Sequence, residues 1–114
     1  MRPSPVQRFF VLAAFALCVL SAPAQAADPE FLLVIKNHKF EPAELKVPAG
    51  QRIKLVIHNQ DGTPEEFESH ALNREKVVPA GARVTIFIGP LKPGRHPFFG
   101  EYNQVTAQGA ITAE

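Results

Sequence analysis

Carboxylates and an imidazole gather in two short stretches of the second half of the chain. The stretch "EEFESH" and the later stretch "GEYN" together hold six carboxylate, imidazole or phenol side chains, namely Glu65, Glu66, Glu68, His70, Glu101 and the only tyrosine, Tyr102. Carboxylate oxygens with an occasional imidazole suit Fe(II), Fe(III), Mn(II) or Cu(II) better than Cu(I). These residue types therefore predict a metal site made mainly of hard ligands, if the fold brings the two stretches together.

Strand alternation decides which of these groups share a face. If Phe67 points into the core, Glu65 points the same way, because side chains alternate along a strand. Glu66, Glu68 and His70 then share the opposite face. One regular strand does not deliver all four groups to a single ion. A bulge at "TPEE" would change the facing, so Glu65 and Glu66 both remain candidate ligands.

The other candidates have competing interpretations. Glu101 is a candidate ligand because it adjoins Gly100, which permits close backbone approach. His70 is either a ligand or an ordinary loop residue. Glu68 is expected on the solvated surface. His96 occupies a position where an inward aromatic side chain is expected. We therefore predict a packed, hydrogen-bonded imidazole that supports a metal site from behind its ligands.

The segments that must position these groups are predicted to be short β-strands. "QRIKLVIHN" and "ARVTIFIG" alternate apolar and polar residues, which predicts half-buried antiparallel strands, and "FLLVIKN" is a more continuous early strand. Turns are indicated by "VPAG", which occurs twice, by "GPLKPG" and by "HNQDGTP". One short helical turn is expected in "FESHALNRE". Six to eight short strands predict an all-β fold, a β-sandwich or a Greek-key barrel.

Residues 1–26 have the features of a secretory signal peptide. Two arginines precede the apolar run "FFVLAAFALCVL", and "AQA" offers a cleavage site after Ala26. The run is shorter than the roughly 20 residues that span a bilayer. A bacterial lipobox has a small residue directly before its cysteine, but here Leu17 precedes Cys18. Secretion without a lipid anchor is therefore favoured. We therefore expect a periplasmic domain at residues 27–114, not inserted in the membrane after cleavage.

The composition of residues 27–114 excludes several classes of function. That segment has 10 basic and 11 acidic residues, a net charge of −1, and no basic patch that would indicate nucleic-acid binding. It contains no cysteine, and therefore neither a disulfide nor a thiolate ligand. No nucleophile–His–acid constellation, P-loop or dinucleotide motif is present, so hydrolase or dehydrogenase activity is unsupported.

Two longer stretches resemble cupredoxins. "FEPAELKVPAGQRIKLVIHNQD" resembles the opening half, with an F-x-P entry, V-x-A-G, an alternating strand and N-x-D, and "PGRHPFFGEYNQVTAQGAITAE" resembles the closing half. More narrowly, "EEFES", "REKVVPAG", "GPLKPG" and "TAQG" resemble the small periplasmic EfeO-type proteins that accompany bacterial high-affinity ferrous iron permeases. The resemblance runs from about Phe40 to Ala113. It implies a cupredoxin-like Greek-key β-sandwich, with the N-x-D loop and the closing loop at the same end.

The same resemblance excludes a blue-copper site. Blue-copper cupredoxins close with Y-x-F-x-C-x-x-H-x-x-M-x-G. On that pattern, Gly100 stands in place of the cysteine and Asn103 in place of the histidine. Ala107 falls near the methionine position, and the remaining histidine position falls near Glu65 or Glu66. A type 1 copper site needs two histidines and a thiolate, so none is expected here.

The resemblance implies an accessory protein of Fe(II) uptake that binds, or helps to oxidise in a ferroxidase-like role, an iron or copper ion. Its implied partner is an inner-membrane iron permease or a periplasmic iron-uptake subunit. EfeO-type proteins commonly have a histidine where this chain has Asn103, and a neutral amide is a poor transition-metal ligand. Either the site is oxygen-dominated, or metal binding has been lost.

Two alternatives accompany this hypothesis. The first is a metal-free interaction module that docks on a permease or periplasmic partner, with "HPFF" and Tyr102 as its apolar contact surface. The second is a copper-handling protein with His and Glu ligands. Met1 is the only methionine, which argues against Cu(I) transfer.

Overall fold

The computed structural model describes residues 14, 16–17 and 27–114, so nearly all of the predicted signal segment, Cys18 included, lies outside the described residues. Within the described part, no helix is long and apolar enough to cross a membrane. The described elements are nine strands and one short 3₁₀ helix: β1 (Glu30–Lys36), β2 (Lys39–Glu41), β3 (Glu44–Val47), β4 (Ile53–Asn59), β5 (Glu65–Ser69), β6 (Arg74–Val78), β7 (Arg83–Ile88), β8 (Gly94–Gly100), η1 (Glu101–Asn103) and β9 (Gln108–Ala113). The prediction of an all-β fold is confirmed.

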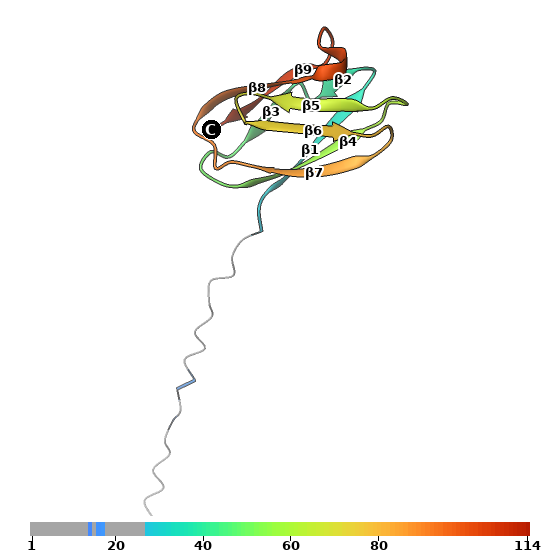
Figure 1. Ribbon diagram of the computed structural model, residues 1–114. Helices are drawn as coiled ribbons and strands as arrows, with labels where there is room; N and C mark the ends of the chain where they lie inside the picture. Colours follow the sequence, from blue (N-terminus) through green and yellow to red (C-terminus); the bar gives the residue numbers. More distant parts are fainter. Residues whose placement is uncertain (1–13, 15, 18–26) are drawn as a thin grey trace, which may run out of the picture.

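The strands form two sheets packed face to face (Figure 1). The four-stranded sheet has the order β2-β1-β4-β7, and the five-stranded sheet has the order β3-β9-β8-β5-β6. Strands β4 and β7, both predicted to be antiparallel strands, pair antiparallel with each other, but β4 also pairs in parallel with β1. The arrangement is consistent with the expected Greek-key β-sandwich. The strand count exceeds the predicted six to eight because the edges carry two very short strands, β2 and β3.

The core lies between the two sheets and contains a cluster of three phenylalanines. The ring of Phe98 lies 4.8 Å from that of Phe40 and 5.2 Å from that of Phe67, measured between centroids. Gly109 lies directly opposite Phe98 on β9, and a Cβ there would stand 2.6 Å from the Phe98 ring. A glycine is therefore required for this packing. The cluster joins β2, β5 and β8. Strand β5 carries Glu65, Glu66 and Glu68, and β8 leads directly into the closing loop with Glu101.

The expected helical turn in "FESHALNRE" is wrong. Residues 70–73 form the turn of a hairpin between β5 and β6, in which Asn73 has a φ of +52°. The hydroxyl of Ser69 organises this turn, since it accepts a hydrogen bond from the Leu72 amide and donates one to the Pro97 carbonyl. The hydrogen bonds of Ser69 thus stabilise a tight hairpin turn in place of the expected helical turn. As a result, "REKVV" continues the sheet as a strand.

We predict that Phe98→Ala lowers the free energy of unfolding by about 3–5 kcal/mol, because it leaves a cavity in the phenylalanine cluster. Chemical denaturation followed by circular dichroism measures the loss. Val105→Ala is the matched control, because Val105 is 95% exposed and its truncation should change stability little. Equal losses for the two variants would contradict this account of the core.

Candidate functional site

Strand β5 presents its glutamates to two different sides of the sheet. Glu65 is 1% exposed and faces inward with Phe67, whereas Glu66, which is 8% exposed, and the half-buried Glu68 point to the opposite side of the sheet. The strand pairs regularly with β6 from Glu65 to Ser69, so no bulge changes this facing. The predicted alternation is therefore observed, and the candidate ligands divide into an inner and an outer group.

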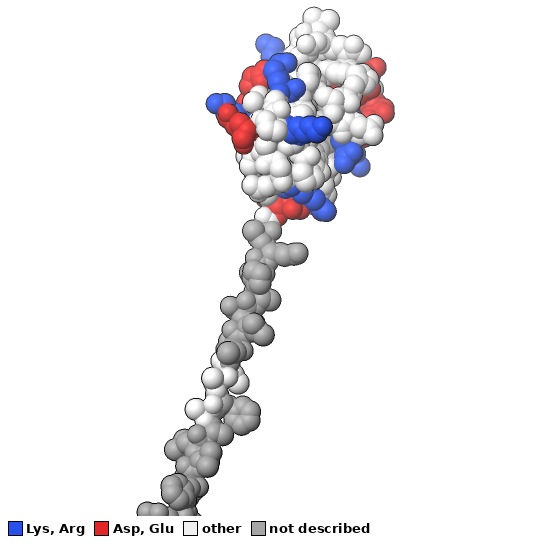
Figure 2. Space-filling view, turned by 90° about the vertical axis from the view of Figure 1, so that its left-hand side faces the viewer, with Lys and Arg blue, Asp and Glu red and all other residues white. Residues whose placement is uncertain are grey.

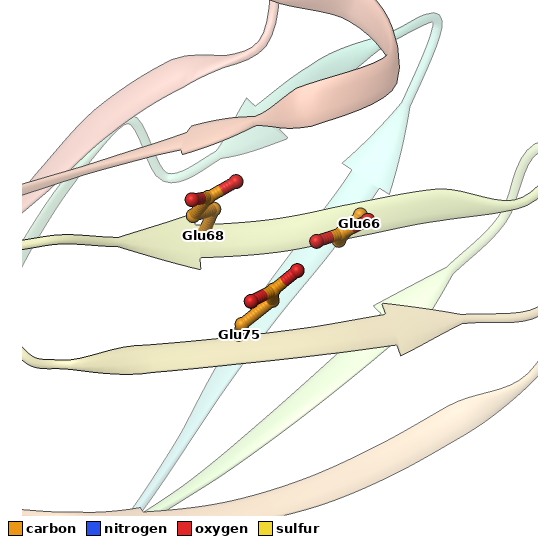
Figure 3. Close-up of side chains that lie close together, drawn as sticks. All are labelled: Glu66, Glu68 and Glu75. Carbon is orange, nitrogen blue, oxygen red and sulfur yellow. The ribbon is translucent and has the colours of Figure 1, made fainter.

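The outer group is a cluster of three carboxylates on β5 and β6. Glu66, Glu68 and Glu75 each offer an oxygen, and these oxygens lie within 4.8 Å of one another. Figure 3 shows the carboxylates of Glu66 and Glu75 turned toward each other across the two strands, with Glu68 beside them. We call this the outer carboxylate cluster. Its three ligands, from two adjacent strands, can hold a hard cation from one side.

Glu75 was missed by sequence reasoning. It lies directly opposite Glu68 in the register of the β5–β6 hairpin. The signal was present, because a tight turn after Ser69 makes "REKVV" the antiparallel partner of "EEFES" and places the two glutamates on one face. Because a helical turn was expected in this segment, the pairing of the two strands was not predicted.

The carboxylates repel one another in the metal-free protein. The pKa of Glu66 is raised above its ordinary value of 4.5, first by hydrogen bonding of its protonated form to Glu75, then by burial and by the charge of Glu75. The pKa of Glu68 is raised in the same way, first by Glu101 and then by burial. Like charges this close disfavour ionisation of both partners, and a bound cation would reverse that effect.

Helix η1 completes the outer face. It follows β8 directly and places Glu101 near Glu68 and Tyr102 near Glu66, since Glu101 raises the pKa of Glu68 and Tyr102 lowers that of Glu66. The pKa of Tyr102 is raised by burial and then by hydrogen bonding to Glu66. The expectation that the loop before β5 and the closing loop lie at one end of the sandwich therefore agrees with the structure.

Two predicted residues, His70 and His96, have different positions. His70 lies at the edge of the outer face, with its Nε2 4.0 Å from the Glu68 carboxylate and a largely exposed side chain. His96 is half-buried, and its Nε2 donates to the Lys92 carbonyl at 2.9 Å. It precedes Gly100 by four residues, roughly 13 Å along β8. Its predicted role behind the metal ligands remains a prediction.

The inner group contains Glu65 and the closing loop. One carboxylate oxygen of Glu65 accepts hydrogen bonds from the backbone amides of Tyr102 (2.9 Å) and Glu66 (3.0 Å). The other oxygen accepts a hydrogen bond from the side-chain amide of Asn103. Gly100 lies against the same carboxylate, since a Cβ there would stand 2.7 Å from Glu65 Cδ. Both oxygens of Glu65 are thus engaged by the protein itself.

A polar loop between β4 and β5 fixes where β5 begins. The side-chain amide of Asn59 donates to the carbonyls of Thr63 (2.8 Å) and Val78 (3.1 Å). The carboxylate of Asp61 accepts hydrogen bonds from the backbone N–H groups of Asn37 and His38, two residues with positive φ angles. These bonds explain the N-x-D pattern, because both polar side chains replace backbone hydrogen bonds that the loop does not make.

Charge elsewhere on the surface is mixed. On the face seen in Figure 2, basic and acidic side chains are interspersed with uncharged surface, and neither sign forms a continuous field. The concentration of carboxylates on β5, β6 and η1 is therefore a local feature. It does not follow from an acidic protein overall, since residues 27–114 have a net charge of only −1.

We predict that Glu75→Gln makes the metal-free protein more stable at about pH 7. A carboxyl with a raised pKa stabilises the fold while it is protonated, and this contribution is lost as the pH rises through its folded pKa. Because Glu75 raises the pKa of Glu66, replacing Glu75 reduces the stability that is lost when Glu66 ionises. The gain in melting temperature over the parent should shrink as the pH falls toward about 4.5.

Thermal melts with a chelator, recorded between about pH 4.5 and 8, measure this difference. Glu41→Gln, at an exposed glutamate on β2, is the matched control and should show no such trend. A Glu75→Gln variant that is less stable than the parent at neutral pH would contradict the repulsion between these carboxylates.

Solved structures with a similar architecture include a blue copper protein and a metal-binding domain of a copper exporter. Auracyanin A, a "blue" copper protein from Chloroflexus aurantiacus, superposes with a TM-score of 0.65 at 12% identity, covering 77% of this chain and 100% of that one. The metal-binding domain of the Cu(I)-exporting P-type ATPase CopA of Streptococcus pneumoniae D39 has a TM-score of 0.63 at 16% identity, covering 75% and 84% of the two chains. At these identities the likeness shows the fold alone.

Sequence comparison gives the family. The uncharacterized protein RP394 of Rickettsia prowazekii (strain Madrid E) is 50% identical over 82 residues, which cover 72% of this chain. The chain spans 66% of that relative's length. Residues 9–113 match the family described as the cupredoxin-like domain. The match covers most of the sequence, and the protein belongs to the cupredoxin-like domain family.

Proposed function

We propose that the protein is a periplasmic accessory protein of ferrous iron uptake that holds Fe(II) at the outer carboxylate cluster. The observation that carries the proposal is the convergence of Glu66, Glu68 and Glu75 within 4.8 Å. An all-oxygen set suits iron and manganese better than Cu(I). The resemblance of "REKVVPAG" and "TAQG" to EfeO-type proteins supports iron as the cargo.

The cluster fits a cation after a small closure of its side chains. Oxygens that share one ion at about 2.1 Å stand about 3.0–4.2 Å apart, and the three oxygens here lie within 4.8 Å of one another. Rotation of the glutamate side chains closes such a gap, and the charge of the ion offsets their repulsion. Water would complete the coordination. Glu101, beside Glu68, is placed to join as a fourth carboxylate or to hold a coordinated water.

Binding at this site also influences redox chemistry. Carboxylates stabilise Fe(III) relative to Fe(II), because the harder and more highly charged ion gains more from anionic oxygen ligands. Iron held here is therefore easier to oxidise by an external one-electron acceptor. We propose that the protein itself contributes the ligands and their geometry, while the permease or another envelope protein receives the iron.

We predict that Glu66→Gln and Glu75→Gln each weaken metal binding at least about tenfold. Calorimetric titration with Fe(II) without oxygen, and with Mn(II) as an oxidation-stable surrogate, measures the affinity. The parent is expected to bind with a dissociation constant of about 10⁻⁵–10⁻³ M, as suits a few carboxylates at a surface.

Glu41→Gln again serves as the control, because it removes an exposed carboxylate outside the cluster. The same titration with Cu(II) compares iron with copper as the cargo. Affinity should fall as the pH is lowered, because protons compete for the same oxygens, and the raised pKa values of Glu66 and Glu68 start this fall above the range of an ordinary glutamate. Binding that is absent, or equal in the cluster variants and in Glu41→Gln, would sink the proposed iron-holding role.

A second candidate function is metal-free docking on a permease or on a periplasmic partner protein. Val105 is 95% exposed and Tyr102 is 51% exposed, both in the closing loop. A contiguous apolar patch marks a contact surface, and Val105 with the ring of Tyr102 would form the centre of such a patch at the tip of the loop. Of the predicted "HPFF" surface, Phe98 belongs to the core, so Phe99 is its only phenylalanine near solvent.

Capture of an envelope iron permease by the tagged protein tests docking. We expect Val105→Asp to reduce capture strongly while metal affinity stays unchanged. Capture that depends on Glu66 and on added Fe(II), and not on Val105, would favour the metal-holding function instead.

A further inference from the structure

We propose that Glu65 is an internal anchor that occupies the place of a metal ion in this sandwich. Its carboxylate fills the interior position beside Gly100 and Asn103, and it fastens the closing loop to β5 without metal. On this proposal Glu65 is a positioning residue and not a ligand. The proposal does not depend on metal binding by the outer carboxylate cluster.

The hydrogen bonds of Glu65 join segments far apart in the chain. Its partners Tyr102 and Asn103 are 37 and 38 residues away. Burying a carboxylate is strongly unfavourable unless donors replace its hydration, and here three N–H groups do so. Two of these donors belong to η1. The network therefore has the geometry of a fastener between the closing loop and the sheet.

The space around the carboxylate leaves no room for a side chain at position 100. A Cβ on Gly100 would stand 2.7 Å from Glu65 Cδ and 2.7 Å from the Ala107 Cβ. A cysteine at this position and the observed Glu65 position therefore exclude each other. The positions that the cupredoxin pattern assigns to copper ligands meet around one carboxylate. We infer that Gly100, Asn103 and Glu65 together replace a set of copper ligands, and that each of the three residues requires the others.

The anchor also positions the outer face. Because Glu65 holds the Tyr102 amide, η1 lies against β5, with Tyr102 beside Glu66 and Glu101 beside Glu68. Two neighbouring residues of β5 thus contact opposite sides of the loop. Glu65 binds its backbone from the interior, and Glu66 lies beside the Tyr102 side chain on the outer face.

A reversal of hydrogen-bond polarity tests the anchor. In Glu65→Gln, the anionic acceptor of three N–H groups becomes a neutral amide. Its own N–H group either faces the Tyr102 amide or requires the Asn103 side chain to flip so that its Oδ1 accepts. In Asn103→Asp, two carboxylates face each other. We expect each single variant to raise the unfolding equilibrium constant about tenfold or more. In the double variant, the new amide at position 65 donates to the new carboxylate at position 103, and most of that loss should be recovered.

The readout specific to an anchor is the order of the loop in metal-free protein. With a chelator present, NMR should show slow hydrogen exchange at the Tyr102 amide of the parent, faster exchange in Glu65→Gln, and recovery in the double variant. Glu41→Gln should leave exchange unchanged. Additive losses in the double variant, a double variant that does not fold, or protection of the Tyr102 amide only after Mn(II) is added would each overturn the proposal.

Discussion

The carboxylate of Glu65 is buried at the apolar interface between the two sheets, where it requires hydrogen-bond donors in place of water, and the surrounding residues supply them. The donors come from the closing loop and from the next residue of β5. The same carboxylate requires a glycine at position 100, because a side chain there would collide with it. The inward facing of Glu65 also sets the facing of its neighbours, since a regular strand must turn Glu66 and Glu68 outward. One buried group therefore organises both sides of this end of the sandwich.

The outer face is arranged differently, because its carboxylates have one another as neighbours. Glu66 is close to Glu75, and Glu68 is close to Glu101, which raises the pKa of Glu66 and of Glu68. Such repulsion makes the metal-free fold less stable at neutral pH, and a surface without a function would gain from losing it. We therefore interpret the outer carboxylate cluster as a cation site on a scaffold whose interior holds a carboxylate.

Much of this could be predicted from the sequence, and the exceptions have physical causes. Alternation around Phe67 correctly separated Glu65 from Glu66, because period two is a local property. Glu75 could not be placed without the register of the β5–β6 hairpin, which depends on the turn after Ser69. The bonding of Glu65 to Asn103 was also beyond local patterns. It joins residues on different elements, and a glutamate in a sequence does not reveal whether its oxygens meet a metal or an amide.

A crystal structure of the protein with saturating Mn(II), examined by anomalous scattering, tests the central claim most directly. The account predicts one ion between Glu66, Glu68 and Glu75, with Glu65 still accepting the Tyr102 and Asn103 donors. An ion inside the sandwich, beside Gly100 and coordinated by Glu65, would contradict the anchor. The lack of any ion at the outer carboxylate cluster would contradict the metal site.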